Sequence, residues 1–425
     1  MALILSPTSA RAESSRNSDA YTRLAPGLNG FYQTLARLEN NPRSVGRVTI
    51  LQIGDSHTAG DHISGRLREL LQERFGNAGR GMLAPGDPYP YYRPYQVKVT
   101  QTRGWLVVSS IKPDTAGPFG LAGYNLRGRR PADKITLAVK DETPAFDMVE
   151  IEYLKRPKAG TIVVAVDGRV VQRIRTAAAK SGFDRTLVRL RKPGREVEVW
   201  PAGDGLIELL SWGVSNNKPG IVYLAHGFGG TTINIVDRWD PDIVGWQLRH
   251  LKPAMIVVAF GTNEGFAPAF DPETYIRDFN ARMALLRRGA PDAAIVVVGP
   301  PDASRLPGYC FKKRDELDGF SCASLSKDEI INYASLLRDQ DRSLCRFHAP
   351  PALAMVRDVQ RAISARNGYL FYDWQQLMKG ECGTDKWARM DPPLAHFDRI
   401  HMRIEGYAMT GEDMFKLILA RYRRR

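Results

Sequence analysis

The chain has 425 residues, of which 43% are hydrophobic and 25% are charged. This length favours more than one domain, and the composition is that of a folded protein rather than of a disordered one. No stretch reaches the roughly 18–20 uninterrupted apolar residues that a membrane-spanning helix needs, so we expect no transmembrane segment.

The chain is basic, with a formal net charge of +14 at pH 7. Such a charge would suit an anionic partner, for example an acidic polysaccharide, a phosphorylated glycolipid, a membrane surface or nucleic acid. The basic residues are spread along the chain, however, and only residues 421–425 form a dense cluster. We therefore favour a generally Arg-rich surface. No zinc finger, RNA-recognition signature or homeodomain-like helix is present, and we expect no nucleic-acid partner.

The first twelve residues resemble the rear half of a secretory signal, because a short apolar run precedes Ala10-x-Ala12. The charged front of such a signal is missing, but we still expect export, to the periplasm. Two disulfides would fit export, although the sequence does not choose among their three pairings, and four buried thiols are the alternative. The four cysteines lie in the C-terminal third and form no C-x-x-C pattern: Cys310, Cys322, Cys345 and Cys382.

The first structured stretch alternates helix and strand. An amphipathic helix is predicted around Gly30–Asn40, and a β-branched run over 45–53 predicts a buried strand that ends at Gly54-Asp55-Ser56. Apolar residues at helical spacing then predict a helix over Ile63–Phe75. Ser56 therefore sits at a strand-to-helix turn.

Between residues 89 and 220 the helical period nearly disappears, and short β-rich segments are separated by Gly, Pro, Asp or Asn. This pattern predicts an inserted β-sandwich of about 130 residues, a sensible size for one domain. Trp105, Tyr124 and Trp212 could stack on sugar rings, but we favour core positions, because aromatic side chains usually dominate core burial.

From residue 221 onwards strands and helices alternate again, which predicts a doubly wound parallel sheet covered on both faces. We expect this α/β domain to comprise residues 13–88 and 221–425. The predicted strands are 221–224, Ala254–Phe260, Ala294–Val298 and Tyr369–Tyr372. The predicted helices are Trp239–Leu251, Pro272–Arg288, Pro351–Arg366 and Ile404–Tyr422.

Ser56 is a candidate nucleophile, because it follows a strand at the edge where open α/β sheets bind their ligands. An ordinary helix N-cap is the alternative. A serine nucleophile needs a base and a group that orients the base. Of the seven histidines, His401 has the best-supported acidic neighbour, Asp398, three residues before it. A surface ion pair is the usual meaning of that spacing, but this pair lies between the last strand and the closing helix.

Two further strand ends offer donors for an oxyanion. Asn263 follows one buried strand, and the Gly-rich residues 227–231 follow another. A helix cap and a tight turn are the alternatives. His396 with His401, or His57 with Asp61, could suggest a metal site, but no spacing such as H-E-x-x-H is present. We therefore expect neither a metal nor a cofactor.

Together, the blocks Gly54-Asp55-Ser56, Gly230, Gly261-x-Asn263 and Asp398-x-x-His401 resemble in order the four blocks of the SGNH (GDSL-like) serine hydrolases. The resemblance covers about residues 45–85 and 221–425. It implies a flavodoxin-like sheet, with Ser56 as nucleophile, His401 as general base and acid, and Asp398 as its orienting partner. The oxyanion hole would comprise the amides of Ser56 and Gly230 and the side chain of Asn263. Gly229 stands where relatives often carry Asn, so it could exchange roles with Gly230.

Gly230 follows Ser56 by 174 residues, which places the β-rich insert between the first two blocks. This layout resembles bacterial peptidoglycan O-acetylesterases, in which an inserted domain similar to a carbohydrate-binding module splits the hydrolase. The resemblance implies an esterase that removes O-acyl groups, often acetyl, from a cell-wall or envelope polysaccharide. An acyltransferase that modifies a glycan, a non-catalytic glycan-binding protein, and a lipase or thioesterase are the alternatives.

The segment from Cys310 to Cys345 contains Lys312-Lys313-Arg314 and is predicted to lie over or beside the active-site edge. It could bind an acidic glycan, but we favour a simple stapled loop. The sequence indicates no oligomeric state.

Overall fold

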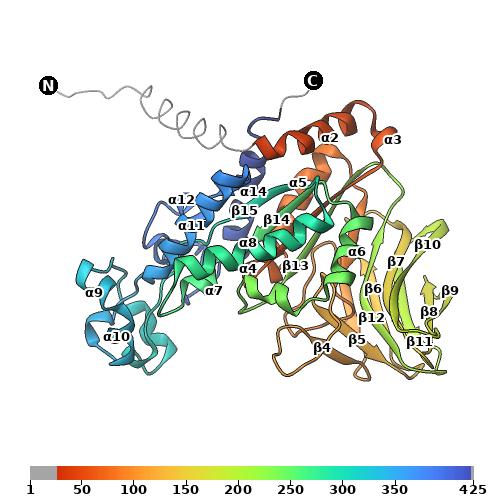
Figure 1. Cartoon of the computed structure of the whole chain (residues 1–425), viewed down its shortest axis with the longest axis horizontal. Helices are drawn as coiled ribbons and strands as arrows, with labels where there is room; N and C mark the ends of the chain where they lie inside the picture. The colour runs from red at the N-terminus through yellow and green to blue at the C-terminus, as the bar shows by residue number, and fades with distance from the viewer. Residues whose placement is uncertain (1–25, 423–425) are drawn as a thin grey trace.

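The computed structural model describes residues 26–422 and contains one parallel sheet and two antiparallel sheets (Figure 1). The signal-like residues 1–12 and the last three arginines lie outside the described residues. Within the described part of the chain, no helix is long and apolar enough to cross a membrane.

The parallel sheet has five strands in the order β13-β1-β14-β15-β16. Numbered along the chain, this order is 2-1-3-4-5, which is the order of flavodoxin-like folds. The predicted doubly wound α/β fold is therefore confirmed. The strands are β1 (Arg47–Gly54), β13 (Gly220–Gly227), β14 (Met255–Ala259), β15 (Ala294–Val298) and β16 (Leu370–Tyr372).

Helices cover both faces of this sheet, because alternate side chains of its strands point to opposite sides. Ile50 packs with one group of helices and Leu51 with the other. The first group is α2 (Asn29–Asn40), α5 (His62–Phe75) and α14 (Ile404–Ile418). The second group is α6 (Pro241–Leu251), α8 (Pro272–Gly289) and α11 (Pro351–Asn367). One end of each of the four predicted helices in this region shifts: α6 begins at Pro241, α8 and α11 end one residue later than predicted, and α14 stops at Ile418.

The two antiparallel sheets share one hydrophobic core and form the predicted sandwich. Trp105, Tyr124 and Trp212 are buried in that core, as favoured above. One sheet contains β2 (Gly79–Leu83), β4 (Leu106–Ser109), β5 (Tyr124–Gly128), β7 (Phe146–Lys155), β10 (Gly182–Gly194) and β12 (Ile207–Ser215). The other contains β3 (Val97–Gln101), β6 (Ile135–Val139), β8 (Thr161–Val166), β9 (Arg169–Arg175) and β11 (Glu196–Pro201).

The start of the antiparallel region differs from the predicted boundary at residue 88. Strand β2 pairs with β12, so residues 79–83 already belong to an antiparallel sheet. The short sequence of β2 does not indicate its partner strand, because β12 lies far along the chain. The division into residues 13–88, 89–220 and 221–425 otherwise stays a prediction.

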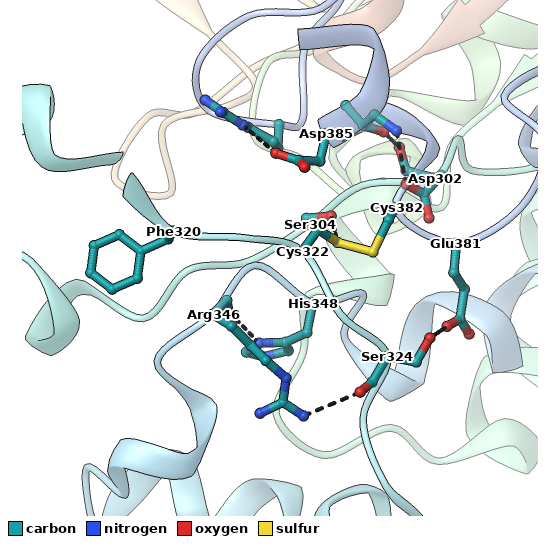
Figure 2. The surroundings of a disulfide bond; sticks show 12 residues. Asp302, Ser304, Phe320, Cys322, Ser324, Arg346, His348, Glu381, Cys382 and Asp385 are labelled. Atoms are coloured by element: carbon teal, nitrogen blue, oxygen red, sulfur yellow. Dashed lines mark hydrogen bonds and ion pairs between the residues drawn. A yellow bond between two sulfur atoms is a disulfide. The ribbon is translucent and has the colours of Figure 1, made fainter. Parts of the chain in front are cut away.

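A third region, here called the stapled segment, comprises residues 310–345 and is closed by the disulfide Cys310–Cys345. A second disulfide, Cys322–Cys382, joins it to the residue before α13 (Gly383–Ala388) (Figure 2). All four cysteines are therefore paired, and the alternative of buried thiols is wrong. The segment contains short helices, among them η4 (Arg314–Gly319), α9 (Lys327–Ile331) and α10 (Tyr333–Arg338). Figure 1 shows α9 and α10 on the opposite side of the molecule from the antiparallel sheets.

Candidate active site

Ser56 lies on the nucleophile turn, residues 54–59, where β1 passes directly into α4 (Ser56–Ala59). Asp55 caps this helix, and its Oδ1 accepts a hydrogen bond of 3.0 Å from the amide of His57. The turn is so tight that a Cβ on Gly54 would lie 2.5 Å from the carbonyl oxygen of Ala259. Because Ser56 is the first residue of α4, its own amide has no acceptor within the helix.

Asp398 and His401 lie on the base loop, residues 396–401, which precedes α14. One oxygen of Asp398 accepts hydrogen bonds from the amides of Ile400 and His401, at 2.9 and 3.0 Å. Its other oxygen lies 2.8 Å from Nδ1 of His401, and Nε2 of His401 lies 2.9 Å from the hydroxyl of Ser56. The structure thus brings together three residues that are connected in the sequence only by their spacing and order.

The electrostatics of this chain of hydrogen bonds suit proton transfer. Burial raises the pKa of Asp398, but hydrogen bonds from His401 and Ile400 outweigh it and lower that pKa to about 2. The hydrogen bond to Asp398 is also the main reason that the pKa of His401 is raised, against the effect of burial. Asp398 is therefore ionised at neutral pH and can stabilise an imidazolium on His401.

Asn263 lies on α7 (Thr262–Gly265), directly after β14. Its Nδ2 donates a hydrogen bond of 2.8 Å to the carbonyl of Thr231, next to the block glycine Gly230. An amide nitrogen carries two protons, so one of them stays available for a ligand. Gly230 has a φ of +72° and is exposed, as is Gly229, so both remain candidates for the backbone donor.

Two buried carboxyl groups support these turns, and neither was assigned a role from the sequence. Glu264 accepts a hydrogen bond of 2.9 Å from the amide of Ile233, which fixes the loop that carries Gly230. Burial raises the pKa of Glu264 to about 7 and that of Asp55 to about 6. The sequence signal that could have pointed to these two carboxyl groups is their position in the motifs, where Asp55 precedes Ser56 and Glu264 follows Asn263.

A buried aromatic layer lies behind His401. The ring of His57 is 5.3 Å from that of His401, and its Nδ1 lies 3.0 Å from the hydroxyl of Tyr407. Trp374 packs against His57 at 5.0 Å. Burial, and after it the charge on His401, lowers the pKa of His57 to about 3, so His57 stays neutral. No sequence pattern indicated this layer.

The pairs considered for a metal site have other roles. Asp61, the acid nearest to His57 in the sequence, accepts hydrogen bonds of 2.8 Å from both Arg68 and Arg80 inside the protein. His396 donates its amide to the carbonyl of His401, which closes the base loop.

Among the described residues, one other group could hold a metal ion: Glu150, Glu152 and His250, between β7 and α6. Nδ1 of His250 lies 3.0 Å from the carbonyl of Trp246, so it carries a proton. A second proton on Nε2 lets the ring pair with Glu152 at 3.0 Å, while Arg185 pairs with Glu150 at 3.1 Å. Arg185 and, when it is protonated, His250 balance the two carboxylates, and the group shares no residue with the Ser56 site.

The stapled segment reaches the base loop. The guanidinium of Arg314 lies 3.4 Å from the centre of the Phe397 ring, next to Asp398. Lys312 and Lys313 are exposed. The segment therefore lies beside the active-site edge, as the sequence predicted.

A parallel sheet of flavodoxin-like order, a serine after its first strand and a D-x-x-H loop before its last helix define the fold of the SGNH (GDSL-like) hydrolases. This chain has that fold, with an inserted β-sandwich.

In particular, the chain is similar to the solved structure of a peptidoglycan O-acetylesterase. The TM-score is 0.70 at 21% sequence identity, over 93% of this chain and 97% of that one. A GDSL-like lipase from Bacteroides thetaiotaomicron VPI-5482 gives a TM-score of 0.29 at 16% identity, over 47% and 76% of the two chains. An acetyl xylan esterase gives 0.31 at 12% identity, over 46% and 80%. No protein-family model matches the sequence, and no curated protein matches it.

Proposed function

We propose that this protein is an exported serine esterase that removes O-acyl groups, acetyl above all, from a cell-wall or envelope polysaccharide. The observation that carries this proposal is the continuous hydrogen-bonded chain from Ser56 through His401 to Asp398, at 2.9 and 2.8 Å. The likeness to a peptidoglycan O-acetylesterase over nearly the whole chain supports the choice of substrate class.

The mechanism follows from the position of each group. His401 takes the proton of Ser56 as its Oγ attacks the ester carbonyl, and Asp398 stabilises the imidazolium that forms. The amides of Ser56 and Gly230 and the free proton of the Asn263 amide donate to the oxyanion. His401 then returns the proton to the departing sugar hydroxyl, and water, deprotonated by the same histidine, releases the acyl group from Ser56.

Export is supported by the two disulfides, which persist in oxidising compartments and are rare in the cytosol. We propose the periplasm as the location. The net charge of +14 would favour an anionic glycan. Because Trp105, Tyr124 and Trp212 are buried, any sugar contact made by the sandwich must come from other residues.

The test is hydrolysis of p-nitrophenyl acetate, of a longer acyl ester and of an O-acetylated glycan, by the wild type and by Ser56→Ala. We expect acetyl substrates to be preferred and kcat to fall about 10⁴- to 10⁶-fold in Ser56→Ala. Equal activity in the variant would contradict the assignment of Ser56.

The same assay separates the alternatives. Release of free acid that drops when a glycan acceptor is added, with acyl groups appearing on the acceptor, would identify an acyltransferase. Glycan binding without turnover of any ester would identify a binding protein.

A further inference from the structure

Arg399 lies inside the base loop, between Asp398 and His401, yet its side chain is only 1% exposed. Its backbone has a φ of +54°, a left-handed conformation that is unfavourable for a residue other than glycine. The carbonyl of Arg399 accepts a hydrogen bond of 2.9 Å from the amide of Ser304. The loop is therefore held in an unfavourable local conformation by contacts outside itself.

The guanidinium of Arg399 joins three parts of the chain. Its Nε donates to Asp385 on α13 at 3.1 Å, and one Nη donates to Asp318 in the stapled segment at 2.9 Å. The other Nη donates to the carbonyl of Phe397 in the base loop at 2.6 Å. The guanidinium also lies 4.7 Å from the centre of the Phe347 ring. Only the planar fork of arginine can satisfy partners in three directions at once.

The two segments that carry these carboxylates are joined by a disulfide. Asp318 precedes Cys322 in the stapled segment, and Asp385 follows Cys382 at the start of α13. The disulfide Cys322–Cys382 connects these two elements, and Figure 2 shows Asp385 and Ser304 beside it. Asp318 is 81% exposed, so its carboxylate would be a weak partner without this anchor.

We propose that Arg399 is a positioning residue for the base loop, through which the disulfide-anchored stapled segment holds Asp398 and His401 in line with Ser56. The proposal rests on the proposed function for the role of His401 as the base. Arg399 itself touches none of the reacting atoms. Its side chain fixes the turn whose backbone amides bind Asp398, and that turn sets the distance from His401 to Ser56.

The experiment compares the wild type with Arg399→Met by kinetics on p-nitrophenyl acetate and by NMR titration of ¹⁵N-labelled histidines, with His401 assigned from a His401→Gln variant. We expect kcat to fall about 10- to 100-fold, since small misplacements of a catalytic group cost about that much, with KM within about twofold. We expect the pKa of His401 to fall, because its hydrogen bond to Asp398 loosens.

The direction of the change in the pKa of His401 distinguishes a positioning role of Arg399 from a purely electrostatic one. Removal of a nearby cation, by itself, would raise the pKa of His401, since Asp318 and Asp385 would lose Arg399 as a partner, although Asp385 would keep its ion pair with Arg389. The other titratable groups that face His401 are Asp55 and His57 on the nucleophile turn and His396 in its own loop, and the variant leaves them in place. An unchanged or raised pKa of His401, or an unchanged kcat, would overturn the proposal.

Two further variants complete the design. Arg346→Met is the matched control, because Arg346 makes two hydrogen bonds to Glu329 within the same region and none to the base loop. It should leave kcat and the pKa of His401 at wild-type values. Arg399→Lys keeps the charge but loses the fork. If Arg399→Met does not fold, a wild-type kcat and pKa in Arg399→Lys overturn the proposal.

The titration does not depend on turnover. If the wild type shows no hydrolysis that requires Ser56, the proposed function fails, while the pKa comparison still decides the role of Arg399.

Discussion

The nucleophile turn and the base loop meet at one hydrogen bond, but they are built in different ways. The nucleophile turn follows β1 without a break, and its contacts are with the ends of neighbouring strands and with its own helix amides. The base loop lies outside the named strands and helices, and its own backbone hydrogen bonds run from the amide of His396 to the carbonyl of His401 and from the amide of Arg399 to the carbonyl of His396. It is held by Arg399, by ion pairs to Asp318 and Asp385, and indirectly by a disulfide.

Because they are built differently, the nucleophile turn and the base loop should respond differently to substitutions. The geometry of the nucleophile turn is a property of the sheet, so it should persist as long as the domain is folded. The base loop depends on contacts between segments far apart in the sequence, so it can lose alignment in a protein that stays folded. Side-chain substitutions near His401 should therefore change catalysis without unfolding, whereas substitutions beneath Ser56 should change stability first.

The largest effect on the base loop is expected for Asp398→Asn. The variant should lose about 10⁴-fold in kcat, since the imidazolium is no longer stabilised and the ring is no longer held in the right tautomer. His401 must be neutral to act as a base, so wild-type kcat/KM should rise with pH through its raised pKa. In Asp398→Asn this acidic limb should move to lower pH. A pH profile measured beside the exposed control Asp391→Asn checks both points, and an unmoved limb would contradict the assignment of Asp398.

Asp61 follows the nucleophile turn and precedes α5, and Asp61→Asn should mainly reduce stability. Asp61 is buried between Arg68 and Arg80, and the loss of its charge leaves two buried cations short of a partner, at a cost of about 3–5 kcal/mol. Burial raises the pKa of Asp61, but the two arginines outweigh it and hold that pKa below its usual range. The ion pairs of Asp61 therefore contribute their full stabilisation above the pKa of an aspartate in the unfolded chain, about 3.9, and this stabilisation is lost as the pH falls.

Urea unfolding at pH 7 measures this effect, with the half-exposed Asp184→Asn as the control. The kcat of folded Asp61→Asn should stay within about threefold of wild type. A large loss of kcat at full stability would place Asp61 in the chemistry instead.

Asn263→Ala should lower kcat about 10²- to 10³-fold, because one donor to the oxyanion disappears. KM should change little, since the donor acts on the charge that develops in the transition state. Steady-state kinetics on the acetyl ester and on the glycan provide the check. Asn234→Ala, an exposed asparagine on η2 (Ile233–Arg238), serves as the control. A rise in KM alone would assign Asn263 to substrate binding.

The smallest effect is expected from removal of the disulfides. The double variant Cys322→Ser/Cys382→Ser removes the bond that anchors Asp318 to α13, and kcat should fall several-fold, about 3- to 10-fold. Cys310→Ser/Cys345→Ser opens the stapled segment but leaves that anchor in place, so kcat should change less. Equal values for the two double variants would show that the anchor does not act on the base loop.

The sequence determined much of this protein by itself. Glycines at strand ends, β-branched runs and helical periods are local signals, and they located the parallel sheet, its helices and the sandwich. Ser56, Asn263, Asp398 and His401 could be chosen as candidates because each follows or precedes a predictable element, and parallel strands bring their carboxyl ends to one edge.

The remaining features depend on contacts between distant parts of the chain. The pairing of β2 with β12, the choice of disulfides and the ion pairs of Arg399 all join residues that no local pattern connects. The burial of Glu264 and His57 depends in the same way on what packs over them. The physical reason is that secondary structure depends largely on hydrogen bonds and periodicity among neighbouring residues. Strand pairing, side-chain burial and the resulting pKa shifts depend instead on which distant segments the fold brings into contact.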